Sequence, residues 1–206
     1  MSAGRNINTV SQSWGTPFKY VKAVKEAFGG IIHLDPCSNE YSIVHAQTEY
    51  LLPRHDGLKE SWNYPTIYVN PPYGIDKDRG TTIKNWLAKC AYAHEEYRSE
   101  VIALIPIAAN TSHWKKYVFT RAHAVCFLYD TRLRFLENGQ DSGKGAPMAC
   151  AMVYWGCRYR DFYNVFIKHG AVVNISDLIG VSIGTERKIP GLFSFVDIKN
   201  AGNHIT

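Results

Sequence analysis

Residues 66–73 read Thr-Ile-Tyr-Val-Asn-Pro-Pro-Tyr, an apolar β-rich run followed at once by two prolines. A residue that precedes a proline is forced towards extended geometry, so Asn70 and Pro71 should be stretched and stiff. The two prolines also lack backbone donors and leave their carbonyl groups free to accept hydrogen bonds. The stretch therefore predicts a buried strand at 66–69 and a rigid loop at its carboxyl end.

Helical and strand patterns alternate on both sides of this strand. The spacing of apolar residues predicts helices at 16–28, 82–97, 112–119 and 161–168. Apolar runs predict further strands at 31–35, 101–107, 124–129 and 148–155, and a short element within 44–52. The alternation predicts an α/β fold with an open, mostly parallel sheet and helices on both faces. Segment 133–136 and strand 148–155 are expected to form a C-terminal β-hairpin at the sheet edge.

The polar and irregular ends of the chain define its expected limits. We expect residues 1–13 to be a flexible N-terminal arm, residues 14–170 to form one domain, and residues 171–206 to be an extension whose structure the pattern leaves undefined. Thr16 and Pro17 resemble a helix start, with a hydroxyl cap and a proline at the first helical position.

The composition limits the classes of function. The chain has 206 residues, 46% hydrophobic, which suffices for a core, and its net charge of +5 permits a polyanionic partner without requiring one. The five cysteines form no C-x-x-C pair, and His94-Glu95-Glu96 lacks the second histidine of a zinc helix, so we expect no metal site. No leader and no membrane-length apolar run is visible, which predicts a soluble, cytoplasmic protein with no membrane partner.

The loop at 70–73 suits chemistry on a planar amino group. The exocyclic amine of adenine is a poor nucleophile because its lone pair is delocalised into the ring. An amide oxygen from Asn70 and a backbone carbonyl can each accept one of its two N–H bonds, which localises the lone pair for attack on a methyl group. Tyr73 would stack on a base flipped out of the duplex, where stacking contributes ~1–3 kcal/mol.

Six motifs occur in order along residues 14–156: Trp14-Gly15-Thr16-Pro17, Leu34-Asp35-Pro36-Cys37-Ser38, Asp56-Gly57-Leu58 with Trp62 following, Val69-Asn70-Pro71-Pro72-Tyr73-Gly74, Leu104-Ile105-Pro106 and Arg132-Leu133-Arg134-Phe135. In this order they resemble the phage-type DNA N6-adenine methyltransferases, compact relatives of the amino-methyltransferases that share an Asp/Asn-Pro-Pro-Tyr/Phe motif. The resemblance implies a Rossmann-like class I methyltransferase domain at 14–170, S-adenosylmethionine as cofactor and DNA as partner.

The resemblance also implies roles for individual residues. Asp35, Pro36 and Cys37 would line the methionine part of the cofactor, while Trp14, Thr16 and Pro17 would close its pocket. Asp56 would accept a hydrogen bond from the cofactor's adenine or ribose, with Leu58 packed nearby. The residues assigned to the transfer step are Asn70, Pro71, Pro72 and Tyr73. The residues assigned to the DNA are Phe135, as a second aromatic against the flipped base, and Arg132 and Arg134, which would meet phosphates.

The chain departs from the family pattern after its first strand. The usual Gly-x-Gly turn is replaced by Cys37-Ser38-Asn39, and the interval from Asp35 to Asn70 is short. Glu49 is therefore a rival to Asp56 as the acid that holds the cofactor's ribose.

Two other readings of the function stay open. An enzyme with the same fold and cofactor could act on another planar NH₂ group, in RNA adenine, N4 of cytosine or a protein glutamine. A catalytically silent nucleic-acid-binding module is the second alternative, against which the intact Asn70-Pro71-Pro72-Tyr73 motif argues. Protection of phage or prophage DNA against restriction and modification of host DNA are both open as biological settings.

Overall fold

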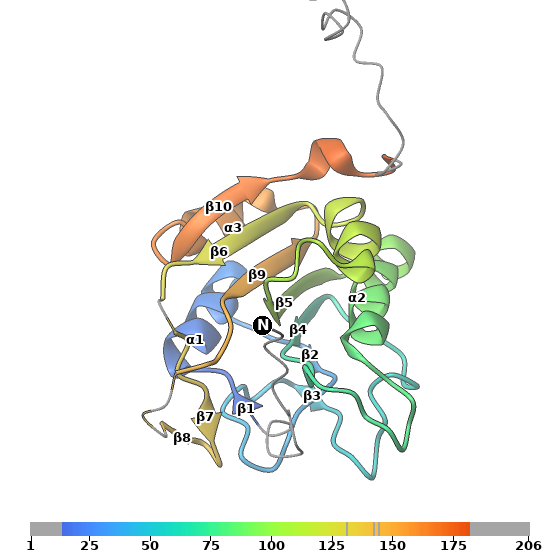
Figure 1. Cartoon of the computed structure of the whole chain (residues 1–206), viewed down its shortest axis with the longest axis vertical. Helices are drawn as coiled ribbons and strands as arrows, with labels where there is room; N and C mark the ends of the chain where they lie inside the picture. Colours follow the sequence, from blue (N-terminus) through green and yellow to red (C-terminus); the bar gives the residue numbers. More distant parts are fainter. Residues whose placement is uncertain (1–13, 131, 142, 144, 182–206) are drawn as a thin grey trace, which may run out of the picture.

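The chain folds around a seven-stranded sheet. A computed structural model describes residues 14–130, 132–141, 143 and 145–181, so the predicted arm at 1–13 and residues 182–206 lie outside the described part. Figure 1 shows the strands in the order β10-β6-β9-β5-β4-β2-β3. Five strands run in one direction: β2 (Leu34–Asp35), β3 (Thr48–Glu49), β4 (Thr66–Val69), β5 (Glu100–Pro106) and β6 (Ala124–Leu128). The two strands that run the opposite way are β9 (Cys150–Trp155) and β10 (Gly170–Asn174).

Helices cover both faces of this sheet (Figure 1). One face carries α1 (Phe18–Ala27) and α3 (Tyr159–Phe166), and the other carries α2 (Ile83–Tyr97) and a π-helical segment, η2 (Trp114–Phe119); a 3₁₀ turn, η3 (Ser176–Leu178), follows β10. Successive side chains of a strand point to opposite faces. In β5, Ile102 therefore packs with α1 and α3, while Val101 and Ala103 pack with α2 and η2. The predicted open, mostly parallel sheet with helices on both faces is confirmed.

The predicted edge hairpin was wrong. Strand β9 lies inside the sheet, antiparallel to both β5 and β6. All six of its residues are buried, which is the environment of a central strand and gives no polar alternation from which an edge could be recognised. Of the segment 133–136, which was expected to pair with it, only Leu136 lies in a strand. That strand, β7 (Leu136–Glu137), belongs to a small separate sheet in the order β1-β7-β8, together with β1 (Trp14–Gly15) and β8 (Gln140–Asp141).

Strand β10 was not expected from the sequence. It begins at Gly170, on the predicted domain boundary, and pairs antiparallel with β6 along Ala124–Leu128. A Cβ at position 170 would overlap the Phe127 carbonyl oxygen, so this close approach requires glycine. A strand that starts on a residue with low strand propensity is hard to recognise.

No helix in the described part of the chain is long and apolar enough to cross a membrane.

Candidate active site

The candidate site lies where the strand order reverses. From β2 the chain moves outwards to β3 and then returns to β4 on the other side of β2. Ligands of open α/β sheets bind outside the carboxyl ends of the strands at such a switch point. Asp35 ends β2 and Asn70 directly follows β4, and both line a cavity of about 20 Å³ together with Trp14, Thr16 and Cys37. The fold thus brings together residues from three of the motifs.

The side-chain amide of Asn70 has a defined orientation. Its Nδ2 donates to the Trp14 carbonyl oxygen at 2.6 Å, and because a carbonyl only accepts, this contact assigns the nitrogen. The other end of the amide, Oδ1, accepts from the Tyr73 hydroxyl at 3.2 Å. That hydroxyl also lies 3.1 Å from the Leu104 carbonyl oxygen. Strand β1 therefore holds Asn70 with its oxygen presented as an acceptor.

Thr16 fixes strand β1 above β4. Its hydroxyl is 2.6 Å from the hydroxyl of Tyr68, and both side chains are buried. Thr16 is therefore not the expected helix cap: α1 begins at Phe18 with Pro17 before it, and no side chain caps it. The buried hydroxyl partner at Tyr68 accounts for the difference.

Three aromatic rings gather beside Asn70. Trp14 stacks on Phe135 with ring centres 5.2 Å apart and planes 17° apart. Tyr73 meets Phe135 edge-on at 5.9 Å and 72°. Phe135 is buried, and burial raises the pKa of the Tyr73 hydroxyl well above its usual range, so this hydroxyl stays protonated as a donor. The predicted aromatics Tyr73 and Phe135 are thus in contact, with Trp14 as a third member.

Asp35 is a buried carboxylic acid. Desolvation raises its pKa to about 7, and the nearby carboxylate of Glu49 at the end of β3 adds to the rise. Its Oδ1 accepts a hydrogen bond from the Cys37 backbone N–H at 3.1 Å, which works in the opposite direction. Burial disfavours the ionised form of a carboxyl group, and a cation that binds beside it stabilises that form. The position therefore suits the positively charged part of a ligand.

A larger cavity of about 380 Å³ opens beside this acid. Pro36 and Cys37 line it from the end of β2, Pro72 from the loop after β4, and Tyr50 and Trp86 add aromatic surface. Cys37 lines the smaller cavity as well, so the two share a wall. The volume and mixed lining are those of a site for a nucleoside-sized molecule.

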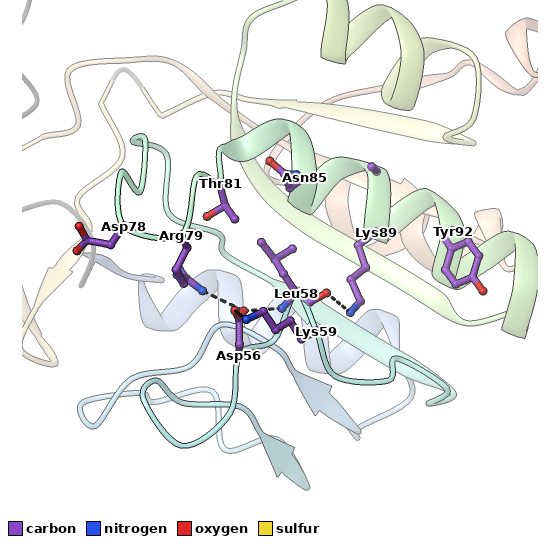
Figure 2. A pocket seen from close by; sticks show the side chains of 10 residues that line it. Asp56, Leu58, Lys59, Asp78, Arg79, Thr81, Asn85, Lys89 and Tyr92 are labelled. Carbon is purple, nitrogen blue, oxygen red and sulfur yellow. Dashed lines mark hydrogen bonds and ion pairs between the residues drawn. The ribbon is translucent and has the colours of Figure 1, made fainter.

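Asp56 and Leu58 lie outside that cavity. They line a neighbouring pocket of about 660 Å³, shown in Figure 2. The Asp56 carboxylate is already paired with Arg79 at 2.9 Å and accepts the Leu58 backbone N–H at 3.1 Å. The rival acid, Glu49, accepts the Ala46 backbone N–H at 3.2 Å and does not line the 380 Å³ cavity. The structure places neither acid in the lining of the 380 Å³ cavity.

Two of the three predicted DNA-facing residues line a fourth pocket, of about 360 Å³. Arg132 and Arg134 line it with Pro17 and Lys19, so Pro17 lies with the arginines and not in the lining of the cofactor-sized cavity. Arg134 makes an exposed ion pair with Asp141 at 3.5 Å. Asp130 and Asp141 line the same pocket and pair with Lys19 and Arg134, so its surface carries both signs of charge. Leu136 also lines the pocket and directly follows Phe135 in the chain, which puts this charged surface beside the aromatic group.

Sequence reasoning missed three contributors to the site. Arg79 and Trp86 line the 380 Å³ cavity, and the Trp14 backbone carbonyl orients Asn70. Arg79 lies in a polar loop and Trp86 on the apolar face of a helix, where neither position carries a local signal. Among the described residues, no group of three or more His, Cys, Asp or Glu side chains could hold a metal ion.

Comparison with models of known protein families gives a match. A family model described as DNA N-6-adenine-methyltransferase (Dam) matches residues 5–182 of the chain. A search of curated proteins finds no match.

Proposed function

The chain belongs to the DNA N-6-adenine-methyltransferase (Dam) family, and from this premise we propose that it transfers a methyl group from S-adenosylmethionine to the exocyclic amine of an adenine flipped out of DNA. The observation that carries this proposal is the orientation of Asn70. Its Oδ1 is presented as an acceptor at the switch point of the sheet, beside the buried acid Asp35.

The loop after β4 would hold the target amine. Asn70 Oδ1 and the Pro71 carbonyl each accept one N–H of the flipped base, which directs the lone pair towards the cofactor side. An incoming N–H replaces the Tyr73 hydroxyl at Asn70, and that hydroxyl keeps the Leu104 carbonyl as an acceptor. This exchange leaves no buried polar group without a partner. Pro72 stiffens the loop, so the geometry is set before the base arrives.

The aromatic group of Trp14, Tyr73 and Phe135 would receive the base. A cavity of about 20 Å³ does not admit an adenine ring, so Phe135 or the small sheet β1-β7-β8 must move aside. Stacking on the aromatic faces offsets the few kcal/mol that base flipping costs. No strongly basic side chain is needed, and the amine's proton leaves to water after transfer.

The residues present fit the proposed cofactor. Bound S-adenosylmethionine supplies an electrophilic methyl group on a positively charged sulfur. Asp35 would face the cationic part of the molecule, while the 380 Å³ cavity with Tyr50 and Trp86 would take the adenosine part. Pro36 and Cys37 line that cavity beside Asp35 and would contact both parts.

The proposal is tested by comparing acceptors. The protein is incubated with labelled S-adenosylmethionine and equal amounts of duplex DNA, RNA or protein, and the products are digested and separated. We expect label in N6-methyladenine from DNA. Label confined to RNA, to N4-methylcytosine or to protein glutamine would contradict the acceptor, and tight DNA binding without cofactor binding would favour a silent module.

Cofactor binding should strengthen as the pH rises from 6 to 7.5. The carboxyl group of Asp35, with a pKa of about 7, is mostly protonated at the lower pH and mostly ionised at the higher. Only the ionised form attracts a cation, so the affinity for S-adenosylmethionine should rise roughly eightfold over this range. Calorimetry at each pH measures it, and a flat profile would remove Asp35 from the cofactor site.

The Asp35→Asn variant provides the matched control. Because the pKa of Asp35 is raised on folding, its ionisation disfavours the folded state increasingly as the pH rises from about 4 to 7. The variant should therefore melt at a higher temperature than the unmodified chain at pH 8, while binding the cofactor weakly and without the pH dependence. A lower melting temperature of the variant at pH 8 would show that ionisation of the Asp35 carboxyl group does not destabilise the folded state.

Arg132 and Arg134 should contribute to DNA affinity through phosphates. Each substitution by alanine should weaken DNA binding several-fold for all sequences alike and lower the slope of log affinity against log salt by about one. Arg160→Ala is the control. Arg160 is an exposed residue of α3, which follows the carboxyl end of β9. Because β9 runs antiparallel to β5, this end lies at the amino end of β5, away from the edge of the sheet that carries the candidate site. An unchanged salt slope in both arginine variants would place the DNA elsewhere.

A further inference from the structure

The loop after Tyr73 is closed on itself by Arg79. Asp76 and Thr81 exchange backbone hydrogen bonds of 2.9 and 3.1 Å across the loop. The Asp76 carboxylate accepts from the Arg79 backbone N–H at 3.0 Å and from its Nε at 2.7 Å. These bonds hold the guanidinium at the base of the loop in a fixed direction.

The same guanidinium reaches a second carboxylate from another part of the chain. Arg79 Nη1 donates to Asp56 Oδ1 at 2.9 Å, as Figure 2 shows, and the Arg79 and Asp56 side chains are 20% and 15% exposed. A planar guanidinium can serve two carboxylates in fixed geometry, which a single ammonium cannot do. At this exposure the pair is partly shielded from water.

The turn that carries Asp56 is itself anchored. A Cβ on Gly57 would overlap the Pro36 carbonyl oxygen, so the turn lies directly against the end of β2. The Trp62 Nε1 donates to the Gly57 carbonyl at 2.8 Å, and Lys89 of α2 donates to the Leu58 carbonyl at 2.7 Å. The Asp56–Leu58 turn is therefore a fixed support.

Arg79 connects two segments that line the cofactor-sized cavity. Gly57 of the anchored turn, Pro72 of the loop that follows β4, and Arg79 all line the 380 Å³ cavity. Asp56 lies next to Gly57, while Asp76 lies four residues after Pro72. The ion pairs of Arg79 thus join the loop after Tyr73 to the Asp56–Leu58 turn, and each of these segments adjoins a residue that lines the cavity.

We propose that Arg79 is a positioning residue that holds the cofactor cavity in its binding-competent width by joining Asp56 to Asp76. The inference rests on the proposed function, because it assigns that cavity to S-adenosylmethionine. We call the two ion pairs of Arg79, with Asp56 and Asp76, the Arg79 clamp. Without this clamp, the loop after Tyr73 samples wider arrangements of the cavity. The apparent affinity for S-adenosylmethionine then falls in proportion to the fraction of molecules whose cavity can still bind it. Asp56, which the resemblance assigned to direct contact with the cofactor, acts through Arg79.

The test measures the dissociation constant for S-adenosylmethionine by calorimetry in Arg79→Lys, Asp56→Asn and the double variant. Each single variant should bind about tenfold more weakly, and the double variant should bind no more weakly than either, because both remove the same clamp. The rate at saturating cofactor and DNA should stay within about threefold of the unmodified chain. Arg121→Lys, in an exposed ion pair with Glu95, should leave the dissociation constant unchanged.

Several results would overturn the clamp. These are an unchanged dissociation constant in Arg79→Lys, multiplicative losses in the double variant, or a lower melting temperature of the free protein with unaltered cofactor binding. Trypsin cleavage after Lys77 gives an independent readout, since it should quicken in Arg79→Lys and be suppressed by cofactor. If the unmodified chain binds S-adenosylmethionine and the variants bind it with the same dissociation constant, the clamp alone is contradicted. If the unmodified chain does not bind S-adenosylmethionine, both the proposed function and the clamp are contradicted.

Discussion

Replacing Asn70 with alanine should lower the rate of methyl transfer to DNA about a thousandfold. The substitution removes the oxygen that accepts an N–H of the target amine, and losing one aimed hydrogen-bonding group at a reacting centre costs about 10²–10³ in rate. Cofactor affinity should stay within about twofold, because Asn70 acts on the target base. Single-turnover rates at saturating cofactor measure the effect, and near-normal turnover would contradict the proposed role.

Asn70→Asp separates the two functions of this side chain. Aspartate keeps an acceptor for the amine but cannot donate to the Trp14 carbonyl, which the amide nitrogen contacts at 2.6 Å. We expect a smaller loss of rate than in the alanine variant, together with a lower melting temperature from the lost bond to β1, worth about 1 kcal/mol. An aspartate variant as inactive as the alanine variant would show that the orientation set by Trp14 matters more than the acceptor.

Tyr73→Ala should reduce activity on paired duplex DNA by about 10- to 100-fold, in keeping with a stacking contribution of ~1–3 kcal/mol. The loss should be smaller when the target adenine is mismatched, because less flipping energy then has to be offset. Tyr73→Phe keeps the ring and removes only the bonds to Asn70 and Leu104, so it should retain most of the activity. Equal losses in Tyr73→Ala on both substrates would assign Tyr73 another role.

Those parts of the fold that repeat a simple period could be predicted from the sequence. The apolar run at 66–69 forms β4 with the predicted bounds, and helix α2 begins beside its Thr82 cap, as its spacing indicates. The antiparallel insertion of β9 between β5 and β6 could not be predicted. A fully buried strand has the same pattern whichever way it runs, so its direction depends on tertiary packing.

The candidate site was predictable where a motif and a strand end coincide. Asp35 and Asn70 come together because adjacent parallel strands end at the same edge, which the alternating pattern already implies. Arg79 could not be found in this way, since its two partners lie 3 and 23 residues away and only the folded loop brings them together. The acidic residue after a turn, Asp56, carries the same local signal whether it binds a ligand or an arginine.

The central claim is most directly tested in cells that lack adenine methylation of their own. DNA from cells expressing the unmodified chain or Asn70→Ala is digested to nucleosides and analysed by mass spectrometry. We predict N6-methyldeoxyadenosine with the unmodified chain and almost none with the variant at equal protein levels. Its absence with the unmodified chain, or equal amounts with both, would contradict the account.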